Sequence, residues 1–195
     1  MRVKTENRRQ AILKAASEIF QEEGFSGASM TMIAARVGGS KATLYNYFSS
    51  KDELFAAVTF DAMETTAQAM VALLEGEVID IRDTLLRFGR AYVDLILSPE
   101  VIMVTRIGMS QGPLTSLGRS LYEKGPGKGW RTISASLTRY HDLGLLNIAD
   151  SKIAALQLKS LLEAGLFEPS LFVVRPTMSR ETIVTQAVTL FLHQY

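Results

Sequence analysis

Apolar residues recur at helical spacing along almost the whole chain, with polar residues on the other face of each segment. In the first segment, about residues 5–23, the apolar positions step by three and four: Ala11, Ile12, Ala15, Ala16, Ile19 and Phe20. The alternation typical of a β-strand is scarce, and the apolar run Leu171–Val174 is too short to support a sheet. The pattern therefore predicts an all-α protein of about nine or ten helices.

Glycine and serine residues mark the ends of short helices near the N-terminus. Gly24 can adopt a left-handed conformation after the first helix. Ser29 and Ser40 precede the second and third helices, where a hydroxyl can accept a hydrogen bond from an exposed backbone N–H. A glycine pair separates these two helices, and we expect the third to span residues 41–48.

A capping box predicts the start of a long fourth helix. The Ser50 hydroxyl can accept a hydrogen bond from the Glu53 N–H, and the Glu53 carboxylate can bond back to Ser50. This helix should run to about Glu75. Further helices are expected at about residues 81–97, 99–109, 114–122, 129–143, 150–167 and 179–193. We expect an N-terminal domain over residues 1–50 and a larger helical domain over residues 51–195.

Two short capped helices joined by a glycine turn, with a third helix behind them, form a helix-turn-helix. A recognition helix needs one free face to enter a major groove about 12 Å wide. Residues 1–51 carry eight Lys and Arg against four Glu, whereas residues 52–195 carry thirteen basic and sixteen acidic residues. A basic N-terminal region favours a nucleic-acid partner, although chance asymmetry on a solvated surface is the alternative.

Residues 29–54, SMTMIAARVGGSKATLYNYFSSKDEL, resemble the DNA-binding domain of the TetR/AcrR transcriptional regulators. The resemblance lies in Ile-Ala, Gly, Ser, Leu-Tyr, Tyr-Phe and Lys-x-Glu-Leu at the spacing of the family. Residues 85–195 are more weakly similar to the C-terminal domain of AefR-like members. The segments that carry this second similarity are residues 118–126, 144–150, 154–155 and 191–192.

The resemblance implies a division of labour among the residues of the helix-turn-helix. Residues implied to hold DNA phosphates are Ser29, Thr31, Ser40, Tyr45, Tyr47 and Lys51. Residues implied to face base edges are Lys41, Ala42, Thr43 and Asn46. Lys41 suits a guanine edge and Asn46 an adenine edge. For the two tyrosines, packing between the third and fourth helices is the alternative.

Four positions depart from the family pattern. Val37 stands where an Ala is usual, and Gly39 stands where an apolar turn residue is usual. Ala42 replaces a frequent Gly, and Asn46 replaces a frequent His. Because Ala42 and Asn46 belong to the reading face, the preferred operator of other members cannot be transferred to this chain.

The last two long helices carry more apolar residues than one inward stripe requires, which indicates a second buried face. Candidate interface residues are Leu156, Leu161, Ala164, Gly165, Ile183, Ala187, Leu190 and Phe191. The resemblance implies a homodimer that pairs these helices as a four-helix bundle, with two recognition helices about 34 Å apart on double-stranded DNA. Small Ala164 and Gly165 would allow the helices to approach closely. Complete burial inside a monomer is the alternative.

The middle helices are expected to enclose a cavity for a small-molecule effector, with no cofactor and no metal. Candidate ligand contacts are Phe60, Met63, Phe88, Tyr92, Met103, Arg106, Ile107, Trp130, Glu163 and Phe167. Taken singly, each of these can equally be a core residue. The expected function is repression of palindromic operators, relieved by an apolar or amphipathic ligand.

Two other classes of function compete with this interpretation. An all-α enzyme is disfavoured because the chain lacks cysteine, its two histidines lie in separate segments, and no catalytic motif occurs. A helix-turn-helix that contacts only proteins is disfavoured by the basic N-terminal region. No apolar run reaches the ~18 residues of a membrane span, and the chain starts without an apolar signal segment, so we expect a cytoplasmic protein without a membrane partner.

Overall fold

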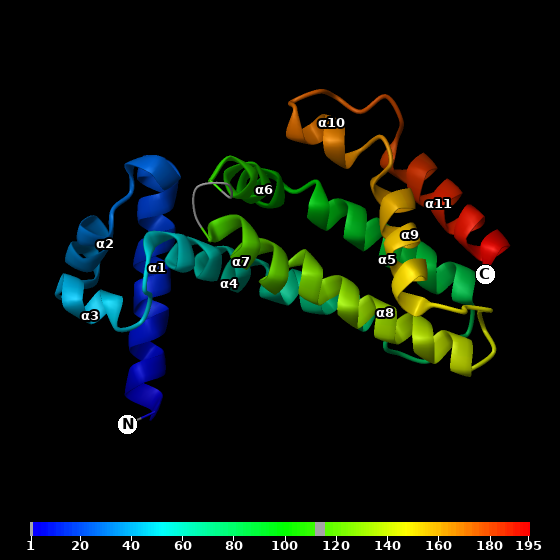
Figure 1. Ribbon diagram of the computed structural model, residues 1–195, viewed down its shortest axis with the longest axis horizontal. Helices are drawn as coiled ribbons and strands as arrows, with labels where there is room; N and C mark the ends of the chain where they lie inside the picture. The colour runs from blue at the N-terminus through cyan, green and yellow to red at the C-terminus, as the bar shows by residue number, and fades with distance from the viewer. Residues whose placement is uncertain (1, 112–115) are drawn as a thin grey trace. The chain divides into compact units, whose positions relative to one another are not determined.

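The computed structural model describes residues 2–111 and 116–195, and the all-α prediction is confirmed there: these residues form helices and turns without a strand. The helices are α1 (Arg2–Gly27), α2 (Met30–Val37), α3 (Lys41–Tyr45), α4 (Lys51–Ala72), α5 (Ile81–Ile96), α6 (Pro99–Gln111), α7 (Leu117–Lys124), α8 (Pro126–Asp142), α9 (Ser151–Glu163), α10 (Phe167–Leu171) and α11 (Arg180–Gln194) (Figure 1). Within this part of the chain, no helix combines the length and apolar character that crossing a membrane requires.

The chain divides into two compact units. The first comprises Met1–Met63 with Ile107–Leu121, and the second comprises Glu64–Arg106 with Tyr122–Tyr195. The division falls inside α4, after Met63. The domain boundary expected after residue 50 therefore stays a prediction.

In the first unit, α2 and α3 lie beside α1 (Figure 1). Ile12, Ile33, Leu44 and Leu54 are fully buried in its core. Phe25 folds back after the bend at Gly24, as expected, so that its ring centroid lies 6.2 Å from that of Phe20 and 4.9 Å from that of Phe55. These aromatic contacts fix the segment that leads from α1 into α2.

The predicted N-caps are confirmed. The hydroxyl of Ser29 accepts from Met32 N at 3.2 Å, and that of Ser40 accepts from Thr43 N at 3.1 Å. The first half of the Ser50–Glu53 capping box is present as well, with Glu53 N to Ser50 Oγ at 3.0 Å.

The returning half of that box differs from the prediction. Glu53 Oε2 accepts from the N–H of Ser49 at 2.8 Å and from its hydroxyl at 2.7 Å, one residue earlier than the pattern indicates. The carboxylate therefore reaches past the N-cap and ties the preceding loop to the first turn of α4.

One of the expected N-terminal helix ends is wrong and one is confirmed. α3 ends at Tyr45 and not at Phe48, because the chain tightens there: Asn46 N bonds to Ala42 O and Thr43 O, and Tyr47 N bonds to Leu44 O. This turn directs Phe48 into the core, where it is buried. At Gly24 the expectation is confirmed: its φ of 68° and ψ of 172° are not helical, so the first helical segment of α1 stops there and a second, short segment runs on to Gly27.

Two expectations in the C-terminal half are also corrected. α8 begins at Pro126 and not near residue 129, because proline suits the first helical turn. The single helix expected over residues 150–167 is broken: α9 ends at Glu163, and the short α10 follows at Phe167. Gly165 has φ 69°, in the left-handed region that glycine tolerates, and so reverses the chain between them. For the helix expected over 114–122, residues 114 and 115 lie outside the described residues, and α7 starts at Leu117.

The core of the second unit lies among α5, α8, α9 and α11. Phe88, Leu137, Leu158 and Val184 are fully buried there. Gly89 lets α5 approach two neighbours at once, because a Cβ built on it would lie 3.0 Å from Leu162 Cδ2 on α9 and 3.0 Å from Val184 Cγ1 on α11. The three helices therefore meet without an intervening side chain at this position.

Candidate functional site

α3 presents one free face. Lys41, Ala42 and Asn46 are exposed, and Tyr45 is 43% exposed, with its ring centroid 5.8 Å from the Lys41 ammonium. On the opposite side, Leu44 is buried against the core of the first unit. The helix is therefore held from behind while its small, cationic and hydrogen-bonding side chains remain accessible.

The turn before α3 depends on a glycine. Gly38 has φ 71° and ψ 45°, and its N–H bonds to Ala34 O and Ala35 O at the end of α2. Gly39 N adds a bond to Ala34 O at 3.0 Å. Because glycine adopts this left-handed conformation most readily, Gly38 suits the end of α2 and the start of the turn into α3.

The remaining residues implied to contact DNA are arranged around this turn. Thr31 and Ser40 are exposed, whereas Ser29, Thr43 and Tyr47 are half-buried. Thr43 Oγ1 lies 2.9 Å from Ser40 Oγ, so part of its polar character is used within the cap. The partial burial of Tyr47 keeps packing between helices open as its role.

Lys51 forms hydrogen bonds within the chain that the sequence pattern did not indicate. Its ammonium donates to Phe25 O at 2.8 Å and to Ala28 O at 3.0 Å, and it lies 4.6 Å from the centroid of the Phe25 ring. The side chain therefore fastens the α1–α2 connection to the start of α4. Two of the three N–H donors of this ammonium are thus used within the chain, and its expected contact with a phosphate stays a prediction.

Arg36 forms a second link between helices, from α2 to α1, that local sequence patterns do not indicate. Its guanidinium donates to both carboxylate oxygens of Glu22, at 2.7 and 3.1 Å, and to Glu18 at 3.3 Å. These hydrogen bonds raise the pKa of Arg36 and lower the pKa of Glu22. The exposed end of α2 is thereby tied to α1.

The ten candidate ligand contacts are divided between the two units. Phe60, Met63 and Ile107 belong to the first unit, and the other seven belong to the second. In the second unit, Phe88, Tyr92 and Trp130 form an aromatic cluster with ring centroids 5.1–6.3 Å apart. All three are buried, and Phe167 packs partly buried against the same core.

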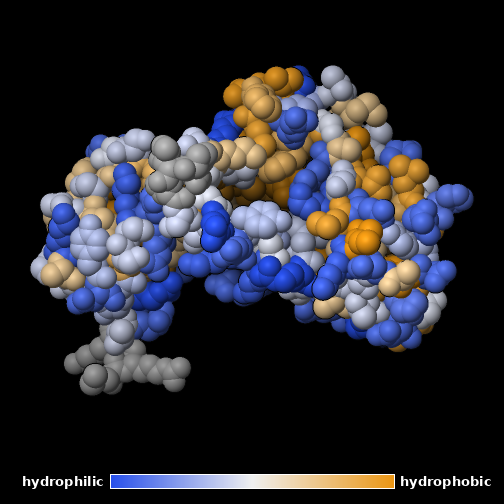
Figure 2. Space-filling view, in the orientation of Figure 1, coloured by the Kyte–Doolittle hydropathy of each residue, from blue (hydrophilic) through white to orange (hydrophobic). Residues whose placement is uncertain are grey.

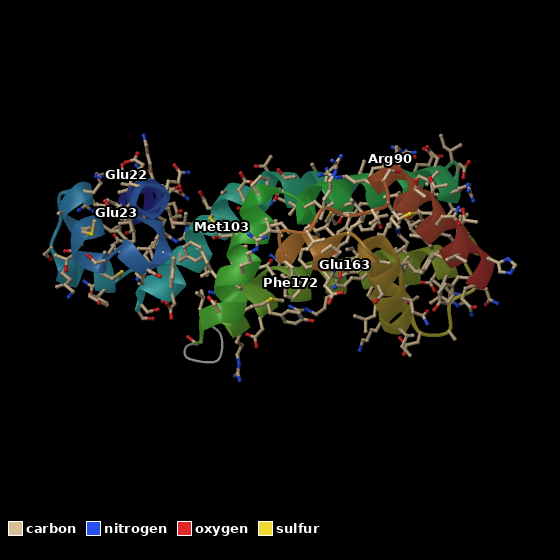
Figure 3. The ribbon with its side chains drawn as sticks, turned by 90° about the horizontal axis from the view of Figure 1, so that it is seen from above. Glu22, Glu23, Arg90, Met103, Glu163 and Phe172 are labelled. Atoms are coloured by element: carbon tan, nitrogen blue, oxygen red, sulfur yellow. The ribbon has the colours of Figure 1, made fainter. Side chains whose placement is uncertain are left out.

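A polar network is attached to this aromatic cluster. The Tyr92 hydroxyl donates to Glu163 Oε1 at 2.5 Å and accepts from Trp130 Nε1 at 3.3 Å, while Lys159 Nζ donates to Glu163 Oε2 at 2.6 Å. Burial, followed by the neighbouring Glu163 charge, raises the pKa of Tyr92 strongly. Figure 3 labels Glu163 where α9 gives way to α10. The network therefore joins α5, α8 and the end of α9.

Two candidate ligand contacts lie elsewhere. Met103 is exposed. Arg106 donates to Leu171 O at 2.8 Å and to Ser170 O at 2.6 Å, and so satisfies carbonyls at the end of α10. Arg106 therefore links α6 to α10, and its expected role as a polar ligand contact stays a prediction.

α9 and α11 present an apolar outer face. Ile153, Leu156 and Leu190 are 53%, 56% and 55% exposed. They line a groove of about 550 Å³ together with Leu161, Ser160 and other residues of the two helices. In the view of Figure 2, apolar residues are visible over α9, α11 and α10. Leu156, Leu161 and Leu190 of the interface expected from sequence lie on this face, and their role in a dimer stays a prediction.

The residues that line this groove do not include Ala164, Gly165 or Ala187 of the expected interface, whereas Phe191 lines it from below. Ala187 and Phe191 are buried in the core of their own chain, because they share the inward row of α11 with Val184. Ala164 and Gly165 lie in the break after α9 and not within a long helix, and their role in an interface stays a prediction. Ile183 is half-buried beside the core.

Comparison with known proteins finds two family models that match this chain. The family model "Bacterial regulatory proteins, tetR family" matches residues 12–58, and "AefR-like transcriptional repressor, C-terminal domain" matches residues 83–195. The HTH-type transcriptional activator FasR of Mycolicibacterium smegmatis is 49% identical over 57 residues, which are 29% of this chain and 26% of FasR. The first curated relatives are matched over only 26–40% of their own length.

Solved structures extend the similarity over nearly the whole chain. A TetR-family protein from Mesorhizobium loti is 24% identical, with a TM-score of 0.82 and 97% of each chain covered. The flavonoid-responsive regulator FrrA is 26% identical, with a TM-score of 0.74 and the same coverage. These matches are to regulators and not to enzymes. Since the second family model alone covers more than half of the sequence, the chain belongs to the TetR family of transcriptional regulators, with an N-terminal helix-turn-helix and an AefR-like C-terminal domain.

Proposed function

We propose that this TetR-family regulator is a homodimeric repressor that binds palindromic operators through α3 and is released by an apolar or amphipathic small molecule. The observation that carries the proposal is the free face of α3, held from behind by buried Leu44. Lys41 and Asn46 supply donors and an acceptor for base edges, and the small Ala42 permits close approach to the groove floor.

The apolar face of α9 and α11 supports a homodimer. Three large aliphatic side chains more than half exposed on one groove are costly in water, and a second copy of the same face would cover them. Isologous pairing around a two-fold axis brings two α3 helices to one duplex in inverted orientation, which corresponds to a palindromic site.

The buried aromatic cluster with its attached carboxylate supports a small-molecule effector. Phe88, Tyr92 and Trp130 offer ring faces and edges, while Glu163 offers a hydrogen-bond acceptor at their rim. FrrA, which is similar along the whole chain, is named as flavonoid-responsive, and a flavonoid is a planar aromatic molecule with hydroxyl groups. We therefore propose an effector of comparable amphipathic chemistry.

Selection of bound duplexes from a random pool tests DNA recognition. The expected result is an enriched inverted repeat with half-site centres about 10 base pairs apart or a multiple of that spacing. Binding should also weaken steeply as salt rises. Failure to enrich any sequence, together with equally poor binding to random and repeated duplexes, would favour a protein-contact module.

Effector release is tested through the single tryptophan of the chain, Trp130, which contacts the proposed site. Titration with a flavonoid should change its fluorescence and, at saturation, weaken operator binding. A ligand that binds both conformations equally shifts nothing. Saturating binding that leaves operator affinity unchanged therefore contradicts the release mechanism. Because FasR is named as an activator, a reporter gene assay decides the sign of regulation.

A further inference from the structure

Arg8 lies against the turn that leads into the recognition helix. A Cβ built on Gly39 would stand 2.5 Å from Nη2 of Arg8 and 3.7 Å from its Cζ. A side chain at position 39 would thus occupy the space that the guanidinium now fills. Position 39 is also one of the places where this sequence departs from the apolar residue usual in the family. Because position 39 has no side chain, the Arg8 guanidinium of α1 can lie beside the residue that precedes Ser40, the N-cap of α3.

The charge of Arg8 is not neutralised within the described chain. Among the described side chains, no carboxylate lies within ion-pair distance of it, whereas Arg36 on α2 is held by Glu18 and Glu22. Its neighbour Arg9 is also engaged, since its guanidinium lies 5.6 Å from the Phe48 ring centroid and 3.9 Å from Glu6. Arg8 is therefore a half-buried, positioned cation beside the reading face.

We propose that Arg8 is an additional DNA contact that binds a backbone phosphate flanking the recognition helix. The glycine at position 39 leaves the space that the Arg8 guanidinium occupies. A guanidinium presents two parallel N–H donors to phosphate oxygens and is always charged. The inference rests on the proposed DNA binding, but it concerns a residue outside the matched helix-turn-helix region, residues 12–58. It also gives a physical reason for the glycine at position 39.

The experiment measures the affinity of the full-length protein for an enriched duplex and for a random duplex over a range of salt concentrations. Arg8→Ala should make the slope of log K against log salt shallower by about 0.9, the value for one lost phosphate contact. Between about 50 and 200 mM salt, the variant should lose roughly 3.5-fold less affinity than the wild type. Both duplexes should weaken alike, because a phosphate contact carries no sequence information.

Arg9→Ala is the matched control on the same helix and should leave the salt slope unchanged. Gly39→Ala tests the same contact by placing a methyl group in the space that the Arg8 guanidinium fills. The variant should fold, because φ at position 39 is not in the left-handed region and the group it displaces is the end of a flexible side chain. It should weaken DNA binding in the wild-type protein and have no further effect on the Arg8→Ala protein. Thermal melting of each variant separates lost binding from lost folding.

The outcomes distinguish this inference from the proposed function. If the wild type binds DNA and Arg8→Ala keeps its affinity and salt slope, the Arg8 contact is wrong and DNA binding stands. If Arg8→Ala weakens only the enriched duplex, Arg8 reads a base, and the phosphate assignment is overturned. If the wild type binds no duplex in a salt-dependent manner, the proposed function itself fails.

Discussion

Tyr45 lies at the edge of the free face of α3, next to Lys41, while the adjacent Leu44 holds the helix to the core. Tyr45→Ala should therefore weaken DNA binding by about 1.5–3 kcal/mol, as for the loss of a hydrogen bond to a charged phosphate, without changing the melting temperature. Tyr45→Phe is the control. If the phenol donates to a phosphate, it should bind as weakly as the alanine variant, and wild-type affinity in both variants would remove Tyr45 from the interface.

Lys41 tests base readout separately from phosphate binding. Its ammonium is exposed in the first turn of α3. Lys41→Ala should cost about 1–3 kcal/mol for one preferred base pair and little for other sequences at that position. The measurement compares the affinities of a set of operators substituted one base pair at a time. Equal weakening across the whole set would identify Lys41 as a phosphate contact.

We expect substitution of Lys51 to affect the stability of the fold more than the affinity for DNA. Removing its two hydrogen bonds to Phe25 O and Ala28 O leaves partly buried carbonyls without their donor. Lys51→Ala should therefore lower the free energy of unfolding by about 1–3 kcal/mol. Lys51→Met keeps the aliphatic stem over Phe25, and we expect it to lose most of the same free energy in chemical denaturation. Unchanged stability with weakened DNA binding would support the phosphate role.

Single residues were predictable from sequence where their partners are close in the chain. Each serine cap bonds to an N–H three residues ahead, so the pattern alone identified Ser29, Ser40 and Ser50. Lys51 bonds to carbonyls 23 and 26 residues earlier in the chain, and no local pattern indicates such partners. The role of this lysine appeared only when α1, α2 and α4 were assembled.

At the scale of helices, the contact between α5 and the end of α9 should depend on pH. Burial and Glu163 raise the pKa of Tyr92, so the folded protein keeps this phenol protonated where an unfolded chain ionises it, above about pH 10. The stabilisation is complete below that pH and is lost as pH rises, by about 1.4 kcal/mol per unit.

Tyr92→Phe removes the ionisable phenol and with it this pH-dependent stabilisation. The difference in the free energy of unfolding between the wild type and Tyr92→Phe, measured with denaturant, should therefore shrink from about pH 9 to pH 11. Tyr122→Phe, on an exposed face of α7, controls for the general effect of alkali. A constant difference between wild type and Tyr92→Phe over this range would contradict the strong coupling of Tyr92 to its surroundings.

Helix positions followed from periodicity, but several ends did not. The apolar spacing over residues 150–167 continues across Ala164 and Gly165, and nothing in it marks the break. The reversal depends on the left-handed conformation of Gly165 and on the clamp that Arg106 forms at the far end of α10, 64 and 65 residues away in the chain. Long-range contacts of this kind override local periodicity.

At the scale of the whole molecule, the exposed leucines of α9 and α11 should control assembly. Leu156→Asp and Leu190→Asp each place a charge on the outer face of the groove, where pairing with a second copy would bury it without a partner. We expect monomers in sedimentation velocity and a large loss of affinity for a palindromic duplex. Ile79→Asp, at a residue 95% exposed outside this face, is the control and should remain dimeric. A monomeric wild type at micromolar concentration would refute the assembly.

The sequence could not separate core residues from interface or ligand residues. Leu190 and Phe191 are adjacent and equally apolar, yet one faces solvent and the other fills the core. Likewise, the candidate ligand residues divide between two units that the hydrophobic pattern does not distinguish. The composition gives the number of apolar residues. Only the three-dimensional arrangement shows which of them are buried in the core and which remain exposed.

The absence of a side chain at Gly89 has a mechanical consequence. Its backbone on α5 lies between Leu162 and Val184, which belong to the two helices that carry the outer apolar face. Tyr92 is one turn further along the same helix, in the aromatic cluster. Because these side chains lie directly against the backbone of α5, a displacement of α5 at this position requires Leu162 and Val184 to move with it.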